Sequence, residues 1–253
     1  MGEYMRLRTT AFWLATAAAA ALSISSASAA DLPAAYKAPV VVDTPWTGGW
    51  QVRARAVAVM PQDKVDLTVP ALGALGALPN TGKVTTTVIP EIDISYYFTP
   101  NIALELILGV TPHKITGKGQ LDGLQVGETW LLPPTLTLQY HFTNFGAFQP
   151  YIGAGVNYTF FFNTSAANTT TVVPLLPNGP AVAVTSLGLK NNWAPAVQVG
   201  FDYMLNKHVG LNFDVKYLWL SSDVTATLNN ALAVTGKTNL DPLLIGGGVT
   251  YRF

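Results

Sequence analysis

The residues best suited to acid–base chemistry in this chain are its three histidines, since it contains no cysteine. His141 shares a predicted strand face with Thr137, as a general base and a hydroxyl nucleophile would have to. Their positions on an extended strand are about 13 Å apart, too far for a hydrogen bond. His113 is expected at a loop edge and His208 in a short turn, without the spacing of a zinc site. The sequence therefore predicts no enzyme activity, catalytic residue, metal site or cofactor.

Charged side chains form a second chemical group, because they recur at alternate positions of otherwise apolar segments. Alternation places them on one face of each strand, opposite the apolar face. The set contains the cations Arg53, Arg55, Lys216 and Arg252 and the carboxylates Glu91, Asp93, Glu105, Asp202 and Asp214, accompanied by Gln139, His141, Gln198 and Asn212. Two interpretations stay open: a neutralised structural plug or an ion-conducting constriction, for which rings of one sign are expected. Four cations against five carboxylates favour the plug.

Eight segments with this alternation predict strands. Their ranges are 49–60, 83–98, 101–110, 130–142, 148–162, 192–205, 209–220 and 241–253. The connections alternate between long (61–82, 111–129, 163–191 and 221–240) and short (99–100, 143–147 and 206–208). This rhythm is typical of outer-membrane barrels, which have long extracellular loops and short periplasmic turns. A β-sandwich has similar strand spacing but no reason to place every short turn on one side.

Composition and the N-terminal segment agree with an exported membrane protein. Arg6 and Arg8 precede an apolar stretch that ends in the small residues Ala27-Ser28-Ala29, a pattern typical of a cleaved signal peptide. Hydrophobic residues make up 49% of the chain and charged residues only 11%. The sequence predicts a signal peptide over 1–29, a flexible periplasmic tail over 30–48, and an all-β, eight-stranded antiparallel transmembrane barrel over 49–253. The neutral net charge indicates no nucleic-acid partner.

Several segments carry a family resemblance. They are Leu132-Pro133-Pro134-Thr135-Leu136 with the strand to Phe142, Pro150 to Phe162, Leu189 to Tyr203, and Leu240 to Phe253. Together they resemble the outer membrane protein W family, over most of the chain and in the right order. The resemblance implies a barrel with a narrow, largely apolar lumen that passes small hydrophobic molecules across the outer membrane. It also implies that Tyr251 and Phe253 form a signal read by the barrel-assembly machinery. The Pro-rich tail and the apolar first loop depart from the family pattern.

The inward positions of the extracellular half are apolar or small, and they predict a hydrophobic ligand site formed by Val57, Val59, Ile107, Thr135 and Ala194. Two loops above them, 69–79 and 172–177, are also apolar. They either bind a ligand or, without one, pack on each other as a cap or touch the outer leaflet. Because proline cannot donate to a ladder, Pro133, Pro134 and Pro195 predict a locally open wall and lateral exit of the ligand into the membrane. The expected partners are outer-membrane lipid and small hydrophobic molecules. A structural or surface-interaction barrel with a sealed lumen, or a small ion pore, remains the alternative.

Overall fold

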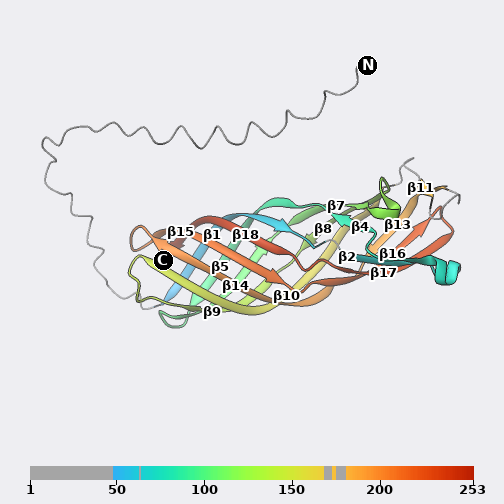
Figure 1. The fold of residues 1–253 in the computed structure, drawn as a ribbon. Coiled ribbons are helices and arrows are strands. Elements are labelled where there is room, and N and C mark those ends of the chain that lie inside the picture. The colour runs from blue at the N-terminus through green and yellow to red at the C-terminus, as the bar shows by residue number, and fades with distance from the viewer. Residues whose placement is uncertain (1–47, 63, 168–172, 175–180) are drawn as a thin grey trace, which may run out of the picture. The chain divides into compact units, whose positions relative to one another are not determined.

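The computed structural model describes residues 48–62, 64–167, 173–174 and 181–253. The predicted signal peptide lies outside the described residues, as do almost all of the predicted tail and most of segment 172–177. The described segments fold into a closed barrel whose strands cross at a tilt (Figure 1).

Eight antiparallel strands form the barrel, as the sequence predicted. They are β1 (Gly49–Met60), β5 (Thr87–Tyr97), β6 (Ile102–Gly109), β9 (Thr135–His141), β10 (Phe148–Ala166), β14 (Asn192–Met204), β15 (Val209–Leu218) and β18 (Leu243–Arg252). Each pairs with the next in this order, and β18 pairs with β1 to close the ring. The turns at residues 98–101, 142–147 and 205–208 lie at one end of the barrel, which we call the short-turn end; the other is the long-loop end.

Buried and exposed residues alternate along these strands because inward side chains fill the lumen and outward ones face the surroundings. The outward face is apolar; Leu138, Ile152 and Val199 are each more than half exposed. Aromatic residues gather on it near both ends, with Trp50, Tyr96 and Phe253 near the short-turn end and Trp130, Phe162, Trp193 and Trp219 near the long-loop end. A belt of exposed apolar residues between aromatic girdles is what a lipid-facing barrel wall requires.

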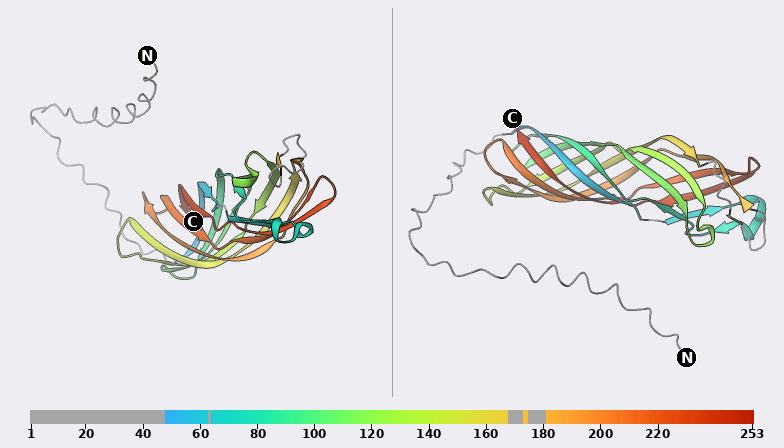
Figure 2. Two further views of the ribbon diagram at one scale, coloured as in Figure 1. Left: turned by 45° about the vertical axis from the view of Figure 1, so that its right-hand side comes forward. Right: turned by 90° about the horizontal axis from the view of Figure 1, so that it is seen from above.

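The long connections were expected to be loops, but much of each one is strand. β10 continues beyond the barrel and pairs with β8 (Gln125–Leu132), followed by β7 (Thr111–Gly117) and β4 (Gly82–Val84). A second sheet contains β13 (Val184–Leu189), β16 (Ser221–Leu228), β17 (Leu232–Asn239), β2 (Lys64–Thr68) and β3 (Ala77–Leu78). The two views in Figure 2 show these strands continuing along the barrel wall at the long-loop end. We call the two sheets the first and second extension sheets.

Short elements complete the long-loop end: β11 (Val173–Pro174), β12 (Ala181–Val182) and the 3-10 helices η1 (Pro70–Gly76) and η2 (Gly119–Leu121). Within the described part of the chain, no helix is long and apolar enough to cross a membrane. The apolar segment 69–79 forms η1 and β3. Its Val69 and Leu78 pack in a buried cluster with Leu121, Leu124 and Val234.

Candidate functional site

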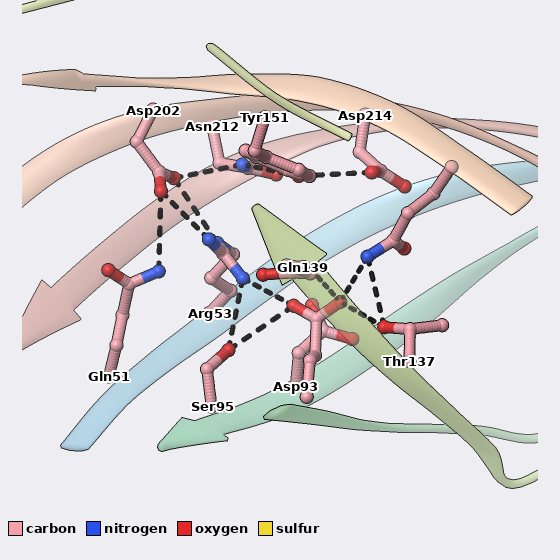
Figure 3. Close-up of polar contacts among 12 residues, drawn as sticks. Gln51, Arg53, Asp93, Ser95, Thr137, Gln139, Tyr151, Asp202, Asn212 and Asp214 are labelled. Atoms are coloured by element: carbon pink, nitrogen blue, oxygen red, sulfur yellow. Dashed lines mark hydrogen bonds and ion pairs between the residues drawn. The ribbon is translucent and has the colours of Figure 1, made fainter. Parts of the chain in front are cut away.

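At the short-turn end, the lumen is filled by hydrogen-bonded polar side chains centred on Arg53 (Figure 3). The Arg53 guanidinium is fully buried and bonds Asp202 through Nη2–Oδ2 (2.8 Å) and Nε–Oδ1 (3.2 Å). Its Nη1 forms an ion pair with Glu105 and donates to Ser95 Oγ at 3.1 Å. Strands β1, β5, β6 and β14 thus contribute to one network across the lumen.

A second charged group lies one layer nearer the long-loop end, around Arg55. Arg55 Nη2 is 2.5 Å from Asp93 Oδ2 and 2.9 Å from Glu91 Oε1. Lys216 Nζ contacts Glu91 Oε1 and Asp214 Oδ1, both at 2.8 Å. The register explains this grouping, because β1 and β5 pair Arg53 with Asp93 and Arg55 with Glu91.

Uncharged side chains complete these networks. Arg252 Nε donates to Gln51 Oε1 (2.6 Å), and Gln139 Nε2 and Gln198 Nε2 donate to Glu105 Oε2 (2.5 and 2.9 Å). His141, Asn212, Tyr97 and Tyr151 are also buried there. All nine predicted charged residues are therefore buried at this end in contact with opposite charge. Sequence reasoning missed Gln51, Ser95, Tyr97 and Tyr151, although their inward parity was the signal that could have found them.

Above the charged layers, an apolar cavity continues into the long-loop end. Glu91 and Lys216 are among its lining residues, which joins the bottom of the cavity to the charged layers. The barrel contributes Val59, Ile89, Ile107, Leu218 and Leu244 to the lining, and the extension sheets contribute Val65, Ile115, Leu131, Val184, Leu187, Val224 and Val234. The structure places Val59, Ile107 and Thr135 of the predicted ligand site in this wall. Val57 and Ala194 instead lie in the buried cluster beside it.

The diproline at Pro133–Pro134 divides the predicted strand 130–142 into β8 and β9, and it interrupts one ladder of the wall. Ile107 pairs with Thr135 and Thr111 with Leu131, but residues 108–110 and 132–134 between them form no backbone pairs with each other. On the other side, β10 bridges the break, because Asn157 Nδ2 donates to the Pro133 and Pro134 carbonyl oxygens (3.0 and 3.3 Å). Gly109 and Pro133 both line the cavity, so the unpaired stretch lies directly beside it.

The prediction of an interrupted wall at Pro195 was wrong. Pro195 stays in register opposite Val156, and its carbonyl accepts a hydrogen bond from Trp219 N at 3.1 Å. The prediction for His113 was also wrong. This residue lies within β7, buried in the cavity wall, because the segment expected to be a loop is a strand.

Comparison with known proteins identifies the fold and the family. The model of the OmpW family matches residues 46–253, which is most of the chain. The chain belongs to the OmpW family. Its short-turn end accordingly faces the periplasm and its long-loop end the exterior, and the protein resides in the outer membrane.

Among curated relatives, the outer-membrane protein y4mB of Sinorhizobium fredii is 44% identical over 81% of this chain and 80% of its own. The dibenzothiophene metabolism operon protein PahQ of Pseudomonas aeruginosa is 32% identical over 64% of this chain and 69% of its own. Among solved structures, the outer membrane protein OprG from P. aeruginosa matches with a TM-score of 0.70 and 28% identity. That match covers 82% of this chain and 96% of OprG.

Proposed function

We propose that this OmpW-family barrel binds small hydrophobic molecules in its apolar cavity and passes them across the outer membrane. The observation that carries the proposal is the apolar cavity lying on a layer of paired buried charges. The lining of the cavity is predominantly aliphatic with a few polar groups, as in most small-molecule sites. The name of PahQ links that relative to metabolism of an apolar aromatic compound, and this supports the same class of ligand.

We propose further that the ligand leaves sideways through the unpaired stretch between residues 108–110 and 132–134. The register supports this location. Residue 107 pairs with 135 on one side of the gap and 111 with 131 on the other, so the two strands keep the same register across it. Gly109 is therefore expected opposite Pro133. Two strands that share no backbone hydrogen bonds there can separate at lower cost than a paired ladder.

The histidine contacts support a role other than catalysis. His113 Nδ1 and His208 Nδ1 are within hydrogen-bond distance of backbone carbonyls, and His141 contacts Tyr97 and Gln139. In none of these described contacts does a histidine meet a serine or threonine hydroxyl, which an activated nucleophile requires. We also propose that the exposed aromatics Tyr251 and Phe253 act as the assembly signal read by the barrel-assembly machinery.

The test measures uptake of N-phenyl-1-naphthylamine by Gram-negative cells that express the protein, together with conductance of the purified protein in planar bilayers. The decisive variant is Gly109→Cys/Pro133→Cys, since the chain has no other cysteine and opposite residues of an antiparallel pair are within disulfide range. A Cβ at Gly109 meets only the tip of Ile89 closely, at 3.1 Å. The same protein after reduction is the matched control.

Saturable uptake with little conductance, lost on oxidation and restored by reductant, is the expected result. Uptake that persists after the disulfide has formed would reject lateral exit at this site but keep the hydrophobic carrier. Conductance without uptake would make the protein a small pore. Absence of both signals would favour a structural or surface-interaction barrel with a sealed lumen.

A further inference from the structure

One side of the apolar cavity carries a small polar patch, formed by Thr111 and His113 of β7 and Thr129 of β8. The register pairs His113 directly with Thr129, and Thr111 lies two residues earlier on the same strand face. All three line the cavity and are at most 5% exposed. Directly paired residues have Cβ atoms about 5 Å apart, so the three side chains are neighbours in a wall that is otherwise mainly aliphatic.

The contacts of His113 determine which of its ring atoms faces a ligand. His113 Nδ1 lies 2.8 Å from the Thr85 carbonyl oxygen, and a carbonyl can only accept, so Nδ1 carries the hydrogen. His113 lies at the level of the aromatic girdle, since the neighbouring Pro112 pairs with the girdle residue Trp130. His113 is buried, and burial in an apolar wall disfavours the charged imidazolium. Nε2 is therefore a hydrogen-bond acceptor, and none of the hydrogen bonds among the described residues involves it.

A second polar atom without a partner lies in the other extension sheet. Thr238 of β17 lines the same cavity, and its Oγ1 is fully buried without a hydrogen bond to the described residues. Buried polar atoms are usually satisfied, and an unsatisfied one is destabilising. Thr238 Oγ1 is such an atom, and His113 Nε2 is an acceptor on a residue of the same cavity wall, which suggests that the occupant of the cavity supplies hydrogen bonds there.

We propose that the preferred ligands of this cavity are neutral molecules with an apolar body and one hydrogen-bond donor, such as an alcohol or a phenol, whose hydroxyl donates to His113 Nε2. This inference rests on the proposed function. A hydrocarbon of the same shape leaves Nε2 unpaired, and an ionised carboxylate has no proton to donate and is disfavoured in an apolar cavity. His113 is then a specificity-determining residue.

The test compares 2-naphthol with naphthalene, which share a ring system and differ by one hydroxyl. Binding of each to the protein in lipid nanodiscs is measured by fluorescence, with protein-free nanodiscs subtracted. His113→Phe keeps an aromatic ring but removes the acceptor, and Lys114→Gln changes the outward neighbour, which is exposed. In the wild type we expect the ratio of the two affinities to favour 2-naphthol, and in His113→Phe we expect it to fall by about 2- to 10-fold, the value of one hydrogen bond. Lys114→Gln is expected to leave the ratio unchanged.

A measurement on the unmodified protein covers the case in which His113→Phe does not fold. The chain has three histidines, so ¹⁵N-histidine labelling gives a simple NMR spectrum in which Nε2 of His113 is expected to shift with 2-naphthol and not with naphthalene. If both ligands bind but the affinity ratio is the same in His113→Phe, or if Nε2 responds equally to both, the inference is overturned while the hydrophobic carrier stands. If neither ligand binds the wild type, the proposed function fails as well.

Discussion

Replacement of Arg53 by methionine tests whether the short-turn end of the lumen is a dry, charge-paired plug. Arg53, Glu105 and Asp202 are all 0% exposed, and Arg53 is the cation placed between the two carboxylates. After Arg53→Met, Asp202 still has Arg252 at 3.6 Å. Glu105 keeps hydrogen bonds from Gln139 and Gln198. Its ion pair is lost, because Arg53 is the single cation that pairs with Glu105 among the described residues.

Breaking a buried ion pair by removing one partner typically costs about 3–5 kcal/mol, because the remaining charge is left uncompensated. We expect Arg53→Met to lower the free energy of unfolding by about this amount. Replacing the pair with neutral groups of similar volume is often nearly neutral, so Arg53→Met/Glu105→Gln is expected to recover most of the loss. The matched control is Lys114→Gln, which breaks an exposed pair with Glu128 (3.3 Å) and is expected to cost at most about 1 kcal/mol.

The assay is urea-induced unfolding from lipid vesicles, followed by tryptophan fluorescence and by the mobility shift of unheated barrels on gels. The reasoning would be refuted if Arg53→Met unfolded within about 1 kcal/mol of the wild type, since water must then reach the carboxylates. It would also be refuted if the double variant were as unstable as the single one, because the loss would then reflect packing rather than uncompensated charge.

Three further predictions concern the cavity and the barrel strands. Ile107→Trp adds volume to a wall residue that is 4% exposed, so we expect lower uptake of N-phenyl-1-naphthylamine at equal expression; unchanged uptake would remove support for ligand passage through this cavity. Asn157→Leu removes the Asn157 hydrogen bonds to the Pro133 and Pro134 carbonyls and the acceptor of the buried Thr159 hydroxyl. It is expected to cost about 1–3 kcal/mol in urea unfolding; a wild-type midpoint would show that this bridge is dispensable. In Gly200→Ala, the new Cβ would lie 2.5 Å from the Phe213 carbonyl oxygen and 2.6 Å from the Tyr151 hydroxyl. We expect a loss of about 1–3 kcal/mol, which a wild-type unfolding curve would contradict.

The barrel strands could be predicted from sequence because their signal is local. In β1, alternation alone gives the limits Gly49 and Met60 that the structure has, and the inward parity of Arg53 and Arg55 follows from it. The pairing of these residues with Asp93 and Glu91 depends on the register between strands, which a single strand does not encode.

The extension sheets escaped prediction for a related reason. Residues 224–228 alternate Val, Thr, Ala, Thr and Leu, which is a strand pattern, but they lie within a segment bounded by serines and asparagines that indicate a loop. Most of the cavity lining outside the barrel comes from such segments. The polar patch around His113 was missed for the same reason, since its inward direction follows only once β7 is known to be a strand.

The energetics of the two ends favour the lateral route over a route through the barrel. An apolar molecule moving toward the short-turn end would have to separate buried ion pairs at Arg55 and Lys216, and then those at Arg53, without supplying any replacement hydrogen bond. Leaving a single buried charge unpaired already costs several kcal/mol. Passage between residues 108–110 and 132–134 breaks no backbone hydrogen bond between these stretches, and it leads to the apolar outer face at Val110. In the proposed route the plug and the gap act together: the first makes axial passage costly, and the second leaves a lateral path to the lipid at the level of the cavity.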